Sequence, residues 1–522
     1  MRSKIISIVL FATVLFASLN ASAKKDKPFV DGTYSRNSIS IVVVNHGDKY
    51  DNVIQEIVNA YKNDKFDYND IDIKVVNSRL PRLIDPKIKY SNGAYIKPMY
   101  SQKEIESLVE DMDFGKSIFS YWFNRTPDGK MDDQRVLERG RYNATDQDVK
   151  NAMATEIGKG NVAEMGYGLI SRSYVIILDV YAAGDYSIEY KDGKKENHSG
   201  CSASAVIYAL DISDNIVDGI FEKGWIYDGD DTKTINKKMA YYEKVKIPVK
   251  ERLVVNEESV EVLSLENKTF EECLNDVIDN ILDNNKMTEW KVASPIINNH
   301  PIESKIGKKE GVKNGMRFSI YTYKENKEGE LKSKRVGYVR AANKIVDNRI
   351  ESDGNTKPTQ FYQISGLPLK SGYTLVEKKD TKTKLDLGLI IYNKRKSSKI
   401  GVGIGCDIGL HHLAYLNTFA GSRFAAFHYA IADYSIGPNT LTLGYGCGLR
   451  LIRMLEFEPY FKIGLGFKNQ KHPDPTRFGV SGGIALNLQI AAPFDFFFRI
   501  GGNGCAQKGE RLDCVFGFRI AF

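Results

Sequence analysis

The stretch FDFFFRIGGNGCAQKGERLDCVFGFRIAF, residues 494–522, alternates between two kinds of side chain with a period of two. Apolar residues, mostly phenylalanine, occupy one parity, while aspartate, arginine and glycine dominate the other. This period is typical of a β-strand, in which successive side chains point to opposite faces. The polar segment between the two alternating runs predicts an antiparallel hairpin. A membrane barrel would turn the apolar face toward lipid, whereas a soluble sandwich would bury it.

The second run ends on Phe522, which has the parity of the apolar face. This end resembles the closing strand of bacterial outer-membrane β-barrels of the eight-stranded type. The resemblance implies that the outer-membrane barrel assembly machinery recognises the chain, with Phe522 as the assembly signal. For this hairpin alone, an edge strand of a soluble sheet is the alternative.

The same alternation extends back to residue 385. At about ten residues per spanning strand, residues 385–522 accommodate eight strands and their connections. The predicted strands are 385–393, 399–410, 424–436, 439–452, 455–468, 476–491, 494–503 and 511–522. The third strand breaks phase near Ile431–Tyr434, which indicates a β-bulge. An even strand number places both barrel ends on one side, which we expect to be the periplasm.

The interior of an eight-stranded barrel is only wide enough for side chains to fill it. Opposite charges confined there are expected to pair, since an unpaired buried charge costs on the order of several kcal/mol. The predicted lumen network consists of Asp386, Asp407, Arg450, Glu458, Lys462, Asp495, Arg499 and Arg519. Glycines of the same parity make room for these side chains: Gly401, Gly403, Gly405, Gly444, Gly446 and Gly448. We therefore expect a plugged lumen, with a conducting or catalytic lumen as the alternative.

The predicted outer loops carry a basic rim. Its residues are Lys394, Arg395, Lys396, Lys399, Lys468, Lys471, Arg477, Lys508 and Arg511. Two interpretations stand: a solvated loop surface, or contact with lipopolysaccharide phosphates by plain electrostatics.

Two cysteines flank the loop of the terminal hairpin. If Phe498 lies opposite Phe516, then Ile500 lies opposite Cys514, and Cys505 falls within the loop on the other face. A disulfide needs Cα atoms within about 7 Å and converging side chains, so no bond is expected between them. Cys505, nearer the loop, is expected to be the more accessible thiol.

The first residues form a secretory signal pattern. A basic start, an apolar run and the small-residue site Ala21-Ser22-Ala23 predict a signal peptide over 1–23, followed by a flexible lead-in over 24–36. No later stretch has about 18 uninterrupted apolar residues, so no transmembrane helix is expected. An exported chain with alternating strands at its end fits the outer membrane of a two-membrane bacterium.

Residues 37–292 mix strand and amphipathic helix patterns and predict an α/β (α+β) periplasmic domain. The strongest hairpin joins a strand over 174–190 to one over 202–212 through a turn at 191–194, and a further strand is expected at 221–227. The order of elements, with the stretches YVIILDV and SAVIYALDIS, resembles the periplasmic domain of the curli-secretion protein family. The resemblance implies a sheet covered by helices. The family's membrane-spanning hairpins are not evident here, so its channel activity is not carried over.

Residues 293–380 predict a small all-β domain and linker. The stretches GVKNGMRFSIY and VGYVRAANKIV look like the small barrel-like domains that follow curli-type or flagellar-assembly-type modules. The resemblance implies contacts rather than chemistry. The fold class expected is thus multidomain, ending in an eight-stranded antiparallel transmembrane β-barrel over 385–522.

The sequence offers no catalytic, metal or cofactor motif, and a formal net charge of +7 is too small to indicate a nucleic-acid partner. Our leading hypothesis is a non-enzymatic outer-membrane protein whose barrel anchors periplasmic domains for binding or assembly. Expected partners are outer-membrane lipid, lipopolysaccharide, the barrel assembly machinery and a periplasmic protein. The alternatives are a small transport or surface-receptor protein, and a barrel enzyme acting on lipid or protein.

Overall fold

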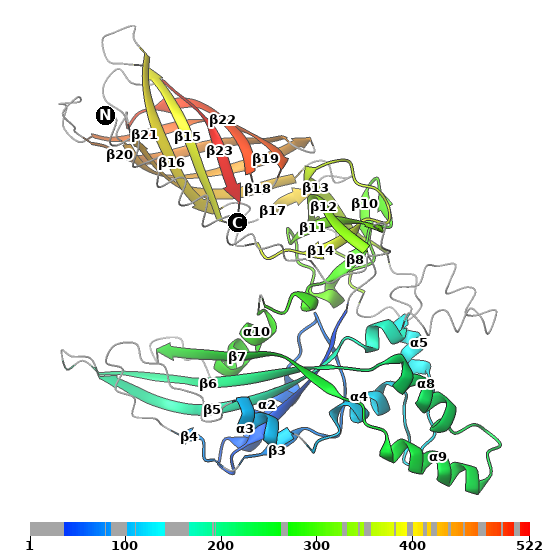
Figure 1. Ribbon diagram of the computed structural model, residues 1–522. Coiled ribbons are helices and arrows are strands. Elements are labelled where there is room, and N and C mark those ends of the chain that lie inside the picture. Colours follow the sequence, from blue (N-terminus) through cyan, green and yellow to red (C-terminus); the bar gives the residue numbers. More distant parts are fainter. Residues whose placement is uncertain are drawn as a thin grey trace.

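The computed structural model of the chain contains three sheets joined in series (Figure 1). It describes residues 36–78, 80–84, 102–109, 111–140, 166–189, 193, 195–262, 270–284, 286–325, 331–342, 345–348, 357–380, 383–393, 400–410, 415–418, 425–436, 440–452, 455–467, 477–491, 494–505 and 512–521. The predicted signal peptide and all of the lead-in except Arg36 lie outside these residues.

The last sheet is a closed antiparallel barrel of eight strands (Figure 1). Its strands are β15 (Thr383–Asn393), β16 (Ile400–Leu410), β18 (Ala425–Ile436), β19 (Thr440–Ile452), β20 (Leu455–Gly466), β21 (Arg477–Ala491), β22 (Phe494–Asn503) and β23 (Leu512–Ala521). Closure comes from β15, which pairs with β16 on one side and with β23 on the other. The predicted barrel is confirmed, with every strand bound within two residues of its expected place. A short extra strand, β17 (Tyr415–Thr418), pairs with the start of β18 within a connection that the sequence predicts as loop.

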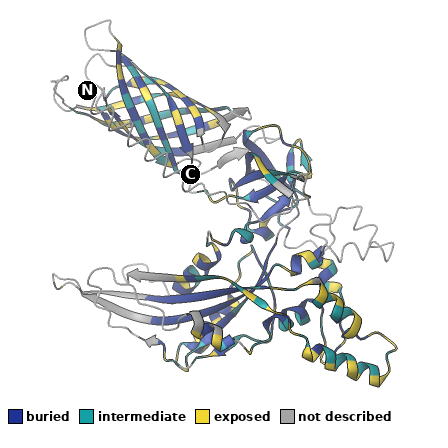
Figure 2. Cartoon of the chain, in the orientation of Figure 1, coloured by how far each residue is buried: buried dark blue, intermediate teal, exposed yellow. Residues whose placement is uncertain are grey.

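Side chains alternate around the barrel as the period-two pattern predicts (Figure 2). Many large apolar side chains of one parity are 39–68% exposed, among them Val402, Leu443, Phe461, Phe478 and Phe518. The other parity points inward and is buried. Ile520 is an exception to the expected outward set, being only 3% exposed. It is the last residue but one of β23.

The bulge predicted in the third strand is wrong. Over its described pairings with β16 and β19, β18 keeps one continuous register from Ala425 to Ile436. Tyr429 and Ile431 point into the barrel and are buried there. Both residues are apolar, as lipid-facing residues are expected to be. The sequence pattern therefore predicted a break in the alternation where the strand has none. Asp433 consequently points inward as well.

The register predicted for the terminal hairpin is confirmed, since Phe498 pairs with Phe516 and Ile500 with Cys514. The expected accessibility of Cys505 is wrong, because this residue is 0% exposed. Its backbone N–H donates to the side chain of Asn503 at 3.1 Å, and its sulfur lies 3.6 Å from the Ser481 hydroxyl. The start of the loop therefore folds over the barrel interior.

The first sheet has helices on both faces, which confirms the α/β class predicted for this region. Its strands are β1 (Ser38–Asn45), β2 (Asp67–Tyr68), β3 (Val75–Asn77), β4 (Leu83–Ile84), β5 (Ser173–Glu189), β6 (Lys195–Leu210) and β7 (Val249–Val262). Helices α2 (Asp51–Ala60) and α10 (Phe270–Leu282) pack on one face. The other face carries α3 (Gln102–Val109), α4 (Phe114–Trp122), α5 (Gln134–Gly140), α8 (Asp214–Lys223) and α9 (Thr232–Lys244).

The strands of this sheet combine two directions. β1 and β5 are parallel, whereas β5, β6 and β7 are antiparallel neighbours. The prediction of a strand at 221–227 is wrong. Ile216 and Ile220 recur at helical spacing and belong to α8, and the strand beside β6 is β7.

The middle sheet is small and antiparallel. Its order is β8 (Ala293–Pro295), β14 (Thr374–Glu377), β11 (Arg317–Glu325), β12 (Leu331–Ala341), β13 (Thr359–Gly366), β10 (Ile302–Ser304) and β9 (Asn298–Asn299). Phe318, Phe361 and Leu375 lie in its core. β13 contacts β21, so this sheet adjoins the barrel end at which the chain enters (Figure 1). Among the described residues, no helix is long and apolar enough to cross a bilayer.

Arg36 ties the first sheet to the middle one, and its guanidinium lies 3.8 Å from the carboxylate of Glu310. Arg36 donates to Asp67 at 2.9 Å and to the carbonyl of Lys309 at 2.6 Å. Arg139 binds the second oxygen of Asp67 at 2.9 Å. Leu169, from the first region, packs into the core of the middle sheet. Charge and apolar contact therefore hold the two sheets together.

Candidate functional site: the barrel interior

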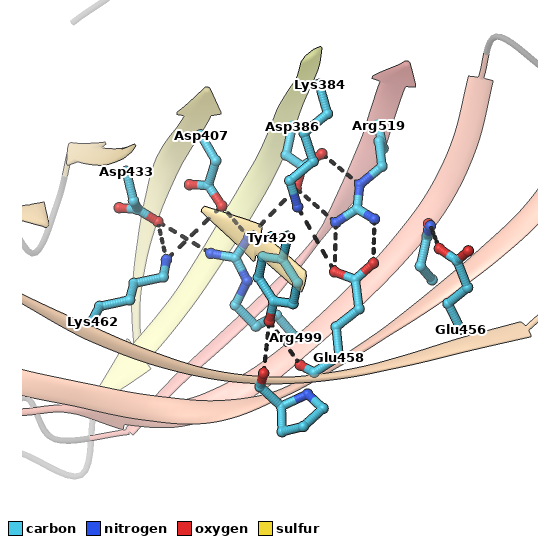
Figure 3. Close-up of polar contacts among 12 residues, drawn as sticks. Lys384, Asp386, Asp407, Tyr429, Asp433, Glu456, Glu458, Lys462, Arg499 and Arg519 are labelled. Atoms are coloured by element: carbon cyan, nitrogen blue, oxygen red, sulfur yellow. Dashed lines mark hydrogen bonds and ion pairs between the residues drawn. The ribbon is translucent and has the colours of Figure 1, made fainter. Parts of the chain in front are cut away.

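The most concentrated chemistry of the described chain lies inside the barrel, where charged side chains from six strands converge (Figure 3). Arg519 of β23 is central to the first group. Its guanidinium donates to Asp386 at 2.8 and 3.1 Å and to Glu458 at 2.6 and 2.9 Å. Lys384 lies 3.5 Å from Asp386 and 3.8 Å from Glu458. We call these four residues the first quartet.

A second quartet lies beside the first. Arg499 donates to Asp433 at 3.1 Å and also binds Asp407. Lys462 donates to Asp433 at 2.7 Å and lies 3.9 Å from Asp407. The two quartets meet where the Arg499 guanidinium approaches Asp386 at 3.7 Å.

Each quartet contains two carboxylates and two cations, so each is neutral when all four groups are charged. Removing such ions from water costs several kcal/mol per ion, on the order given by Born solvation. Bidentate pairing of a guanidinium with a carboxylate, supported by additional hydrogen bonds, offsets this cost. All eight side chains are nearly excluded from solvent. Each quartet is therefore nearly sealed from solvent, with its own charges balanced.

Aromatic rings and glycines fit the remaining volume. The Tyr429 hydroxyl donates to the carbonyl of Pro459 at 2.8 Å, and the Lys384 ammonium lies 4.9 Å from the Tyr429 ring centre. A Cβ at Gly446 would lie 2.5 Å from that ring, and one at Gly444 would lie 2.7 Å from Lys462. These glycines leave space for interior side chains, as the sequence indicates. Farther along the interior, an apolar cluster consists of Ile390, Tyr392, Phe497 and Val515.

The structure brings together six of the residues predicted for the lumen: Asp386, Asp407, Glu458, Lys462, Arg499 and Arg519. Asp495 is buried with the interior parity, and its backbone pairs with Arg519. Arg450 pairs with Glu456 across β19 and β20, but its side chain lies outside the described residues. The predicted rim also lies outside them, except for Arg477, which starts β21 and whose side chain is not described. Phe522 is likewise outside.

Three charged interior residues escaped the sequence prediction. Lys384 lies one residue before the predicted start of the first barrel strand. Asp433 was not assigned to the interior, because the sequence predicted a break in the alternation of its strand. Glu456 has the parity of Glu458 and accepts a hydrogen bond from Asn487 at 3.1 Å. The parity rule alone would have found Glu456, whereas Asp433 required knowledge that Tyr429 and Ile431 point inward.

A second buried polar group lies at the carboxyl end of β1. His46 Nε2 is 2.8 Å from Asp179, and its Nδ1 is 2.7 Å from the carbonyl of Leu80. Because a carbonyl and an ionised carboxylate can only accept, both ring nitrogens must donate, as in a protonated imidazole. Arg82 pairs with Asp51 at 2.8 Å beside them. No group of three potential metal-binding side chains occurs among the described residues.

The pKa of His46 is raised above its ordinary value. Burial lowers it, but the hydrogen bonds to Asp179 and Leu80 outweigh burial. A raised pKa means that His46 stabilises the fold below its unfolded pKa of about 6.5, and that this contribution is lost as pH rises through the folded value. Asp51 has a lowered pKa, since hydrogen bonds from His46 and Arg82 outweigh burial, so its contribution is lost only in acid.

Raising the pH from about 6 to about 9 is therefore expected to lower the thermal stability of the first sheet, and His46→Gln should flatten this slope. All three tryptophans lie in the first region, at positions 122, 225 and 290, so tryptophan fluorescence reports its melting. His300→Gln, a substitution in the middle sheet, serves as the control and should keep the wild-type slope. Equal slopes for wild type and His46→Gln would contradict the protonated pair.

Comparisons with known proteins add little. No protein-family model matches the chain, and no curated protein matches it. A solved structure described as "De novo design of transmembrane beta-barrels" is similar at 14% identity, over 28% of this chain and 98% of its own, with a TM-score of 0.19. At this TM-score the likeness adds nothing to the barrel geometry described above.

Proposed function

We propose that the barrel spans a bilayer, that of the bacterial outer membrane, and anchors the first and middle sheets on its periplasmic side. There these two sheets bind another component of the cell envelope, without enzymatic chemistry. The observation that carries this proposal is the pairing of an apolar exterior with an interior that is filled by two charge-balanced quartets. The predicted signal peptide supports export.

The exterior supports insertion into lipid. Outward side chains on every strand from β15 to β23 except the short β17 include exposed leucine, isoleucine, valine, phenylalanine or tyrosine. Burying apolar surface yields about 25 cal/mol per Å², so leaving such a continuous belt in water is unfavourable. Exposed apolar patches of this extent are typical of interaction or membrane surfaces. A lipid environment removes the belt from water.

The interior supports an anchoring role over a conducting one. The two quartets, the tyrosine ring and the apolar cluster occupy the space that a pore would need. Eight-stranded barrels are narrow enough for side chains to fill them. Most of the described residues before β15 belong to the two other sheets, which supports a binding role for them.

The topology of the barrel supports placing the first and middle sheets on the same side of the membrane. Lys384 at the start of β15 pairs with Ala521 at the end of β23, so the chain enters and leaves at one end. At this end only two residues separate β19 from β20, and only two separate β21 from β22, and such short connections are typical of the periplasmic side of outer-membrane barrels. The predicted basic rim belongs to the opposite loops, where lipopolysaccharide phosphates would meet it.

The membrane setting is tested by Ile484→Arg, a change in the middle of the outward face of β21. In a bilayer, arginine at mid-depth costs about 2–4 kcal/mol. On a water-exposed surface the same change would lie within about 0.5 kcal/mol of neutral. We expect a large fall in the urea midpoint of the folded gel band in lipid vesicles, with Ile484→Leu as the matched control. Equal midpoints for the arginine and leucine variants would exclude lipid contact at this position.

The anchoring role is tested by planar-bilayer recording of the full-length protein. We expect no large stable conductance, because the two quartets and the apolar cluster fill the interior. Large stable pores from the wild-type protein would contradict the anchoring proposal, but they would still agree with insertion of the barrel into a membrane.

A further inference from the structure

The region of the middle sheet carries the excess positive charge of the chain. Residues 293–380 contain 17 lysines and arginines against 10 aspartates and glutamates, and this excess equals the formal net charge of +7 of the whole chain. The region leads directly into the barrel, because β15 begins at Thr383. Positive charge next to a membrane-spanning segment attracts the anionic lipids of that membrane.

One face of the middle sheet is turned toward the end of the barrel, where β13 contacts β21 (Figure 1). Arg317 and Tyr338 lie on this face, with the guanidinium 5.9 Å from the ring centre. Burial lowers the pKa of Arg317, and the carboxylates of Asp380 and of Asp495 in β22 partly offset this effect. A carboxylate of the barrel therefore lies close enough to act on this face of the sheet.

Arg335 lies on the same face, outside its buried part. Its guanidinium is 5.1 Å from the ring centre of Tyr338, the ring that Arg317 also approaches. Tyr338 is only 5% exposed, whereas the side chain of Arg335 is exposed and forms no ion pair with any described residue. The barrel-facing side of the middle sheet therefore presents an accessible positive charge.

An exposed leucine lies beside this arginine. The backbone N–H of Leu367 donates to the carbonyl of Val336 at 3.1 Å, which places the loop after β13 next to Arg335. The side chain of Leu367 is 65% exposed, and Lys334 is exposed as well. The nearby hairpin segment 324–332 carries three lysines and three glutamates, so it adds no net charge. Apolar and basic side chains together are typical of surfaces that contact a lipid interface.

We propose that this part of the middle sheet binds anionic phospholipid of the leaflet that surrounds the entry end of the barrel. Arg335 and Lys334 pair with the lipid phosphate, and Leu367 enters the boundary of the acyl chains. The contact attaches the middle sheet to the membrane a second time, besides its chain connection to β15. The inference rests on the proposed function, since it requires the barrel to span a bilayer.

The test uses the full-length protein with Leu367→Trp, reconstituted into vesicles. Tryptophan fluorescence is quenched on contact with brominated acyl chains. The three native tryptophans lie in the first region, so only the introduced tryptophan is expected to reach the lipid. The vesicles consist of chain-brominated phosphatidylcholine, alone or mixed with chain-brominated phosphatidylglycerol. We expect stronger quenching in the variant than in the wild-type protein, and a further increase when phosphatidylglycerol is present.

Adding Arg335→Gln to Leu367→Trp should reduce the preference for phosphatidylglycerol about fivefold, because a basic residue at an anionic surface contributes about 1 kcal/mol. Lys313→Gln is the matched control. It removes the same charge from the exposed turn before β11, near Lys65 of the first sheet, and should leave the quenching unchanged.

The compact, heat-modifiable band on a cold gel reports insertion of the barrel in each sample. Protein that does not insert would overturn the proposed function, and this inference with it. In inserted protein, quenching no stronger than that of the wild type, or equal quenching with and without phosphatidylglycerol, would overturn the lipid site alone. Equal losses for Arg335→Gln and Lys313→Gln would likewise exclude a site at Arg335.

Discussion

Arg519→Leu is expected to leave the barrel largely without its compact, heat-modifiable form on a cold gel. The guanidinium of Arg519 makes four hydrogen bonds to Asp386 and Glu458 inside the barrel. Its loss leaves two buried carboxylates facing one lysine. Breaking a buried pair by removing one partner costs about 3–5 kcal/mol, because an uncompensated charge stays behind. The urea midpoint of the folded band measures this loss.

A neutralising second change provides the control. Adding Glu458→Gln to Arg519→Leu returns the first quartet to zero net charge. We expect the double variant to recover part of the lost stability, although the hydrogen bonds of Arg519 remain absent. If the double variant is less stable than Arg519→Leu alone, charge balance is not what stabilises the interior.

Gly517→Val is expected to prevent closure of the barrel. Gly517 lies on β23 opposite Gly388 of β15, at the seam between the last strand and the first. A Cβ at Gly517 would collide with the backbone oxygen of Leu387 and lie 2.5 Å from the Cα of Gly388. Backbone cannot move aside as a side chain can, so the cost should be about 3 kcal/mol or more. The expected result is unfolded monomer or precursor in place of the compact band.

Gly482→Ala is the matched control within the same barrel. A Cβ at Gly482 would meet the carbonyl of Tyr460 at 3.4 Å, an ordinary contact distance. This variant should fold and migrate like the wild-type protein. Similar failure of both variants would point to a general need for glycine in these strands, and normal folding of Gly517→Val would mean that the seam is not closely packed.

The barrel could be predicted from the sequence because its strands are two-sided. A slip of one residue would exchange the apolar and polar faces, so parity fixes the orientation of each side chain. Parity does not say which inward residues meet, however. Asp386 and Arg519 are 133 residues apart and pair only because the barrel closes. Asp433 was missed for another reason. Its neighbours that point into the barrel are apolar, so the sequence of this strand does not show a regular alternation of apolar and polar residues.

The first sheet was harder to predict. The hairpin of β5 and β6 has a local turn signal, and the structure contains it. The parallel pairing of Ser38 with Ser173 has none, because no turn joins strands so far apart in the chain.

The balanced quartets also constrain how this protein can evolve. A single substitution that changes the charge at Asp386, Glu458, Asp433 or another quartet position leaves that quartet with a net charge, so such changes should survive only with a compensating change in the same quartet. Outward positions such as Val402 or Leu443 face no such condition and can drift among apolar residues. Among related sequences, the quartet positions should therefore covary as sets, and the outward face should vary one residue at a time.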